Sequence, residues 1–247
     1  MTENKNSINQ KWYASWFDTP FYHILYKDRD YQEAQHFMDN LTGYLNLPDE
    51  AKILDLACGK GRHSIYLNSL GYDVTGADLS ENSIAEASKF ANERLQFKVH
   101  DMRHTCEEKY DAIFNLFTSF GYFEKDEDNL TTLKAIHNSL NETGFACIDF
   151  MNVDYVIANL VPEEIKTVEN IDFHIKRYVK DNHIFKEIDF IYEGEKYHFT
   201  EKVQALRLAD FEQMMEEAGI YLLDIFGNYK LQKFYKNDSE RLIMIFK

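Results

Sequence analysis

The stretch from Lys52 to Ser80 constrains the fold of this chain more than any other part of its sequence. It opens with a short apolar run and continues into a loop in which Gly59 and Gly61 allow a sharp turn close to a ligand. A helical pattern follows and stops at a glycine, and a second apolar run, Tyr72 to Ala77, ends in Asp78. This order of strand, glycine loop, helix, strand and acid predicts a nucleoside-binding α/β unit.

The residues inside the loop separate two kinds of cofactor. The loop reads Asp55-x-Ala57-x-Gly59-x-Gly61, and Ser64 stands where a dinucleotide fingerprint has its third glycine. An acid in the loop would repel a pyrophosphate and would suit an ammonium group. The stretch resembles the cofactor-binding motif of class I S-adenosylmethionine-dependent methyltransferases, in which Asp/Glu-x-x-x-Gly-x-Gly ends the first strand and an acid ends the second. Another nucleotide-binding α/β unit is the alternative.

The resemblance implies roles for particular residues. In that family the loop holds the amino acid part of the cofactor and the second acid holds its ribose. An acid after the third strand contacts the adenine amino group and the next apolar residue packs on the ring, which corresponds here to Asp101 and Met102, although Asp101 could instead cap its loop. The cofactor-binding residues expected in this half of the chain are Asp55, Ala57, Gly59, Gly61, Arg62, His63, Asp78, Leu79, Asp101 and Met102.

The run from Asn115 to Phe123 gives a second match. It follows an expected strand over Tyr110 to Leu116 and looks like the equivalent loop of bacterial small-molecule methyltransferases. Aromatic faces accept a cationic methyl sulfonium favourably, so we expect a wall shared by cofactor and substrate. Packing at the mouth of the sheet is the alternative. The residues expected to contact the cofactor here are Asn115, Phe117 and Ser119.

The N-terminal arm, residues 1–50, is dense in aromatics between residues 11 and 26. Asp30 and Glu33 have capping-box spacing, which predicts a helix that ends before Pro48. Tyr22 and Tyr26 are the residues expected to cover the cofactor, because the segment Leu25-Tyr26-x-x-Arg29-Asp30 looks like the N-terminal segment of small-molecule methyltransferases. The alternative is that the aromatics pack the arm onto the core.

The rest of the chain predicts the fold class. A core over residues 51–153 and 207–247 should form a Rossmann-like, mostly parallel sheet with helices on both faces. The end of the chain resembles the sixth and seventh strands of the methyltransferase fold, which implies a seven-stranded sheet with the last strand antiparallel. Further strands are expected at Leu95–His100, Phe145–Phe150, Tyr221–Phe226 and Arg241–Phe246, and helices at Glu81–Asn92, Asp126–Asn141 and Leu208–Ala218.

Residues 154–206 interrupt this rhythm with an insert. A short helix near Asp154–Leu160 leads to three segments of period two, which predict a small antiparallel sheet. The segments are Thr167–Val179, Ile184–Tyr192 and Tyr197–Arg207, with turns at residues 180–182 and 193–195. The insert is expected to be a lid over the cofactor pocket or a platform for a homodimer.

Composition limits the partners and the compartment. The net charge of −15 over 247 residues should repel nucleic acid and anionic membranes. The three cysteines lack metal-ligand spacing, so we expect buried free thiols and a reducing cytoplasm. The N-terminus lacks the apolar core of a signal peptide, and no apolar run approaches the length that spans a membrane.

The resemblance implies S-adenosylmethionine-dependent methyl transfer, and we expect the acceptor to be a nitrogen or oxygen of a small molecule. The alternatives are a methyltransferase for RNA or protein, a nucleotide-binding protein without catalysis, and an NAD-dependent oxidoreductase. No catalytic residue is assigned, because methyl transfer needs a base only when the acceptor must lose a proton early. Candidate bases are Tyr22, Tyr26, His23, His63, His174, His183 and His198. A surface or capping role is the default for each of the histidines. No metal is expected.

Overall fold

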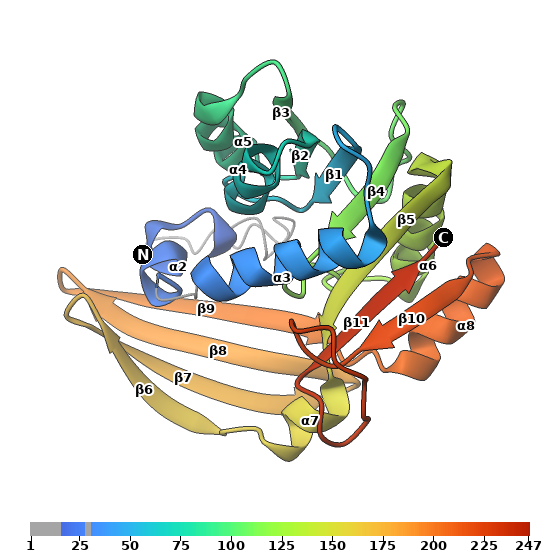
Figure 1. Cartoon of the computed structure of the whole chain (residues 1–247). Coiled ribbons are helices and arrows are strands. Elements are labelled where there is room, and N and C mark those ends of the chain that lie inside the picture. The colour runs from blue at the N-terminus through green and yellow to red at the C-terminus, as the bar shows by residue number, and fades with distance from the viewer. Residues whose placement is uncertain (1–15, 28–30) are drawn as a thin grey trace.

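The computed structural model describes residues 16–27 and 31–247 and contains two β-sheets (Figure 1). The large sheet has seven strands in the order β10-β11-β5-β4-β1-β2-β3. β1 to β5 pair in parallel, whereas β11 is antiparallel to both β5 and β10, which confirms the predicted class. Its strands are β1 (Lys52–Leu56), β2 (Asp73–Asp78), β3 (Leu95–Val99), β4 (Tyr110–Asn115), β5 (Leu140–Met151), β10 (Leu222–Phe226) and β11 (Arg241–Phe246).

Helices cover both faces of the large sheet because alternate residues of its strands are apolar on opposite sides. Ile243 of β11 belongs to the core formed with α3 and α4, whereas Met244 belongs to the core formed with α6 and α8. These helices are α3 (Tyr31–Leu45), α4 (Arg62–Ser69), α6 (Asp126–Ser139) and α8 (Leu208–Ala218), and α5 (Glu81–Ala87) follows β2. None of the described helices is long and apolar enough to cross a membrane.

Two element boundaries differ from the prediction by five residues each, and several others differ by less. The helix expected over Glu81–Asn92 ends at Ala87 and continues only as one 3₁₀ turn, Ser88–Phe90. β5 begins at Leu140, directly after α6, rather than at Phe145. Neither boundary has a proline or a glycine, the residues that mark element ends in a sequence. The early end of the helix and the early start of the strand could therefore not be predicted.

The insert forms a separate antiparallel sheet in the order β6-β7-β8-β9, reached through α7 (Val153–Ala158). The prediction of a single segment over Thr167–Val179 was wrong, because a two-residue turn at Glu169 and Asn170 divides it. Both residues have positive φ, 50° and 63°, as two-residue hairpin turns require, but the turn contains no glycine to reveal it. The strands are β6 (Glu163–Val168), β7 (Ile171–Lys180), β8 (His183–Tyr192) and β9 (Glu195–Gln204).

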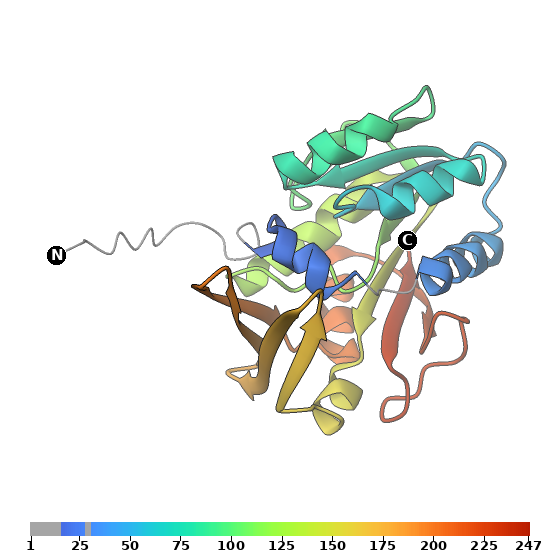
Figure 2. The same cartoon turned by 90° about the vertical axis from the view of Figure 1, so that its left-hand side faces the viewer.

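Residues 16–27 of the arm pack on the insert, whereas α3 packs on the large sheet. Figure 2 shows α2 (Pro20–Leu25) lying against the small sheet, where Trp16 and Leu25 join an apolar cluster with Phe173 and Phe190. The helix predicted in the second half of the arm is confirmed as α3. Its expected cap, Asp30, lies outside the described residues, as do Arg29 and the aromatics at positions 12 and 13.

Candidate cofactor and substrate site

A cavity of about 520 Å³ lies where the carboxyl ends of β1, β2 and β4 meet the arm and the insert. Parallel strands of an open α/β sheet bind ligands at this edge. Gly61 and Asn115 are the predicted site residues that do not line it. Those that do are Tyr22, Tyr26, Asp55, Ala57, Gly59, Arg62, His63, Asp78, Leu79, Asp101, Met102, Phe117 and Ser119. Of the candidate bases, His23 also lines the cavity, whereas His174, His183 and His198 do not.

The glycine loop is folded against Asp78. The carboxylate of Asp78 accepts the N–H of Gly59 at 2.8 Å and the N–H of Ser80 at 2.9 Å. Ala57, Gly59 and Gly61 all have positive φ, so the loop turns tightly at alternate residues. A Cβ on Gly59 would meet nothing within 4 Å, which leaves the backbone open to the cavity at this point. The acid at the end of β2 and the open loop are therefore one unit.

Gly61 does not line the cavity, and its role is in packing. A Cβ at this position would lie 2.5 Å from the ring of Phe97 in β3 and 3.1 Å from the Cβ of Ala87. The missing side chain lets the start of α4 approach β3 and α5 closely. Asn115 is likewise buried below the cavity, where its amide donates to the backbone carbonyl of Leu56 at 3.0 Å and ties β4 to β1.

Asp55 is a buried acid, and its burial disfavours the charged form of the carboxyl group. The hydroxyl of Ser64, at the position of the absent third glycine, donates to its carboxylate at 2.6 Å. Burial raises the pKa of Asp55 to about 6, and the Ser64 hydrogen bond opposes this rise. Burial also raises the pKa of Asp78, against the two backbone N–H bonds that it accepts. The two acids give this end of the cavity a negative character that suits ammonium and hydroxyl donors.

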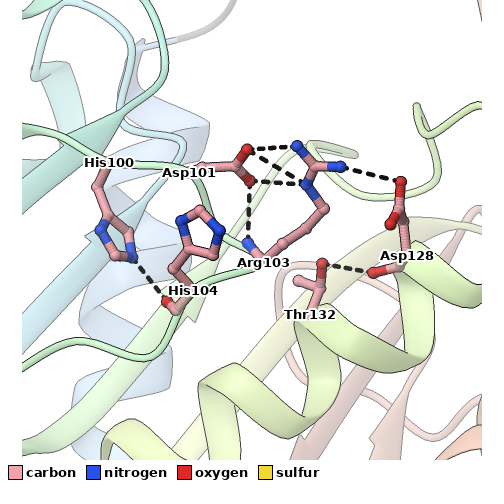
Figure 3. Close-up of polar contacts among 6 residues, drawn as sticks. All are labelled: His100, Asp101, Arg103, His104, Asp128 and Thr132. Carbon is pink, nitrogen blue, oxygen red and sulfur yellow. Dashed lines mark hydrogen bonds and ion pairs between the residues drawn. The ribbon is translucent and has the colours of Figure 1, made fainter.

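Asp101 lies at the cavity and also caps its own loop. Its carboxylate accepts the backbone N–H of Arg103 at 3.1 Å, as a loop cap does. Figure 3 shows the guanidinium of Arg103 between two carboxylates, with contacts of 2.6 Å to Asp101 and 3.0 Å to Asp128 at the start of α6. The ion pair fixes the direction of the Asp101 side chain at the cavity wall.

The loop after β4 carries unusual backbone strain. Phe117 and Thr118 have φ values of 58° and 60°, which non-glycine residues adopt only when their surroundings hold them there. The Phe117 ring stacks on His63 with centroids 4.6 Å apart and planes at 20°. This contact joins the loop after β4 to the start of α4.

Asp149 and Arg241, which the sequence reading missed, hold this strained loop. Asp149 is fully buried in β5, and its carboxylate accepts the N–H of Phe117 at 2.8 Å. Arg241 of β11 donates to Asp149 at 2.7 Å and to the hydroxyl of Thr118 at 2.9 Å. The sequence contained one signal for this pair, an acid within the apolar run from Phe145 to Phe150.

Glu201 is a further residue that the sequence did not indicate. It extends from β9 into the cavity wall, and its Oε1 accepts the indole N–H of Trp16 and the hydroxyl of Tyr26, both at 2.7 Å. The arm and the insert are thus joined beside the cavity. Tyr22 and Tyr26 lie at this junction, with ring centroids 4.9 Å apart.

The groups around the cavity fit S-adenosylmethionine. An acid at the end of β2, an open glycine loop with acids nearby, and aromatic faces match its ribose, ammonium and sulfonium groups. Across residues 16–27 and 31–247, no group of three or more His, Cys, Asp or Glu side chains could hold a metal ion.

Known proteins resemble this chain over the same region. Residues 53–144 match the family described as "Methyltransferase domain". The putative methyltransferase YqeM of Bacillus subtilis is 28% identical over 189 residues, which cover 72% of this chain and 76% of that protein. TehB of Haemophilus influenzae, a probable S-adenosyl-L-methionine-dependent methyltransferase, is 32% identical over 63% of this chain, and the match spans 55% of its own length. A glycine/sarcosine N-methyltransferase of Aphanothece halophytica is 26% identical over 89% of this chain and 83% of its own.

A solved structure agrees with the fold. The S-adenosylmethionine-dependent methyltransferase from Clostridium acetobutylicum superposes with a TM-score of 0.77 and 22% identity, over 91% of this chain and 94% of that one. At 22% identity the structural likeness shows the fold alone. The family match over residues 53–144 includes the glycine loop and Asp78. Taken together with the cavity and its donor groups, these similarities support a class I S-adenosylmethionine-dependent methyltransferase.

Proposed function

We propose that this enzyme transfers the methyl group of S-adenosylmethionine to a nitrogen or oxygen atom of a small molecule. The observation that supports a small acceptor is the size of the cavity, which is lined by the glycine loop, the arm and the insert and has a volume of about 520 Å³. Pockets of this size suit small ligands. An RNA or protein acceptor would need an open groove, and the net charge of −15 opposes RNA.

The cavity residues have proposed roles in holding the cofactor. Asp78 accepts the ribose hydroxyls, the loop around Gly59 with Asp55 holds the amino acid part, and Asp101 and Met102 hold the adenine. Tyr22, Tyr26, Phe117 and Ser119 complete the wall, while Ala57, Arg62, His63 and Leu79 shape the cradle. When bound, the cofactor supplies a methyl group on a positively charged sulfur, and the contribution of the chain is to hold the acceptor in line with it.

The insert acts in this proposal as a lid. Its inner face carries the arm and contributes Glu201 to the cavity, so it excludes water from the acceptor. A homodimer formed through the outer face of the insert is a separate prediction. Light scattering of the purified protein tests it, because it measures the molecular mass in solution. The three cysteines are buried free thiols, which supports a cytoplasmic enzyme.

A methyl-release assay tests the proposed function. Purified enzyme with S-adenosylmethionine should form S-adenosylhomocysteine when small amines or hydroxyl compounds are added, and should form none with total RNA or denatured protein. The glycine/sarcosine N-methyltransferase among the relatives makes sarcosine a reasonable first acceptor. Turnover confined to RNA or protein would contradict the proposal, and so would a protein that binds the cofactor but methylates nothing in a broad metabolite screen.

A further inference from the structure

Glu201 presents a carboxylate to the cavity with one oxygen already fixed. Trp16 and Tyr26 both donate to Oε1, so the side chain is held in a single orientation. Oε2 forms an ion pair with the ammonium of Lys186 at 3.9 Å, a separation beyond hydrogen-bond distance. Within residues 16–27 and 31–247, no hydrogen bond reaches Oε2. Glu201 lines the cavity, and its Oε2 keeps the capacity to accept a hydrogen bond from a ligand there.

Aromatic rings continue from this carboxylate along the cavity. Centroid distances are 4.9 Å from Tyr26 to Tyr22, 5.0 Å from Tyr22 to Phe17, and 5.8 Å from Phe17 to Tyr122. All of these residues line the cavity together with Glu201. Aromatic faces attract cations, and a carboxylate beside them adds direction to that attraction. Lys186 does not line the cavity, but its ammonium donates to the Tyr26 hydroxyl and lies 4.5 Å from the centroid of the Tyr26 ring. Glu201 is the charged side chain that the insert contributes to the cavity lining.

We infer that Glu201 and the ring series Phe17, Tyr22, Tyr26 and Tyr122 bind the amino group of the acceptor, which is a small primary or secondary amine. The inference rests on the proposed function, because the acceptor must enter this cavity. Glu201 accepts an N–H of the amine and thereby orients its nitrogen. A hydroxyl compound of the same shape brings neither the positive charge nor the second donor, so the site discriminates against it.

Isothermal titration of the protein saturated with S-adenosylhomocysteine tests this site. The probes are three amines and their hydroxyl counterparts: ethanolamine and ethylene glycol, tyramine and tyrosol, glucosamine and glucose. At least one amine should bind the wild-type protein about tenfold or more tightly than its counterpart, the size of one charge-assisted hydrogen bond. This comparison needs no variant.

Variants then assign the preference to Glu201. Glu201→Gln keeps an oxygen for Trp16 and Tyr26 but removes the charge, and it should erase the preference for the amine while S-adenosylhomocysteine binds within about twofold of wild type. Glu187→Gln is the matched control, because Glu187 lies on the same small sheet, accepts the hydroxyl of Tyr178 at 2.8 Å and does not line the cavity. It should leave both affinities unchanged.

Trp16 gives an independent signal. With Trp12 replaced by phenylalanine, Trp16 is the remaining tryptophan of the two in the chain, and its hydrogen bond to Glu201 should make its emission respond to the amine.

Failure of the wild-type protein to bind S-adenosylhomocysteine would overturn the proposed function itself. Cofactor binding with no amine bound, with equal binding of amines and hydroxyl compounds, or with an unchanged preference in Glu201→Gln would overturn the amine site and leave the proposed function standing.

Discussion

Arg241 donates from Nε to the carboxylate of Asp149 across 2.7 Å, and this buried pair holds the loop after β4 in its left-handed conformation. Asp149 is fully buried, and the side chain of Arg241 is 18% exposed. The pair reaches the loop through the backbone of Phe117 and the hydroxyl of Thr118. Neither Asp149 nor Arg241 lines the cavity, so they position a wall that other residues form.

Arg241→Ala should therefore destabilise the protein and loosen the loop. Loss of one partner of a buried ion pair costs about 3–5 kcal/mol, because the remaining carboxylate is left buried without its partner. Urea denaturation measures the change in the free energy of unfolding. Arg207→Ala is the control, since Arg207 pairs with Asp154 at 3.0 Å while 41% exposed, and loss of such a surface pair costs under about 1 kcal/mol. Equal losses in the two variants would contradict a special role for Arg241.

The two glycines of the loop should respond differently to alanine. Gly61→Ala forces a Cβ to within 2.5 Å of Phe97 and strains a φ of 79°, so the free energy of unfolding should fall, by more than about 2 kcal/mol. Gly59→Ala meets no neighbour within 4 Å and strains only φ, which costs about 1 kcal/mol. Because Gly59 faces the cavity, its variant should instead lose more affinity for S-adenosylhomocysteine. Denaturation and titration of both variants check this, and the reverse ranking of stabilities would contradict it.

The buried acid Asp55 predicts a dependence of stability on pH. Burial raises its pKa from 3.8 to about 6, so between these values the folded protein holds a proton that the unfolded chain has released. Stability from this group is therefore greatest below about pH 4 and is lost as pH rises through about 6, by roughly 3 kcal/mol in total.

Asp55→Asn removes this titration and keeps an oxygen for the hydroxyl of Ser64. The variant should be more stable than wild type at about pH 7, and its advantage should shrink toward about pH 4. Urea denaturation of both proteins across this range isolates the contribution, because their other ionisable groups are the same. A difference in stability that stays constant with pH would show that the acid does not titrate in this window.

The sequence predicted the parts of the site that lie close together along the chain. Asp55, Gly59 and Asp78 belong to one strand, loop, helix and strand unit, whose geometry follows from local rules. The sequence also predicted that Asp101 and Phe117 lie at the cavity, because each comes after a parallel strand. The carboxyl ends of parallel strands meet at one edge of the sheet.

The parts that depend on distant packing were not visible in the sequence. Glu201 lies 175 residues from Tyr26, and nothing in the alternation of β9 marks it as different from the other acids of the insert. Arg241 is the first residue of its strand, where a charged side chain ordinarily faces solvent. The fourth strand of the insert was missed because a turn of Glu169 and Asn170 adopts positive φ without glycine.

Isothermal titration of the purified protein with S-adenosylmethionine, S-adenosylhomocysteine and NAD is the most direct test of the whole account. Both adenosyl ligands should bind with micromolar affinity and NAD should not bind. Asp78→Ala should weaken the adenosyl ligands by at least about tenfold, the size of one lost charge-assisted hydrogen bond. Asp73→Ala, at the other end of β2, should leave them unchanged. Binding of NAD alone, binding of none of the three, or equal affinities in wild type and Asp78→Ala would contradict the assignment of this cavity to S-adenosylmethionine.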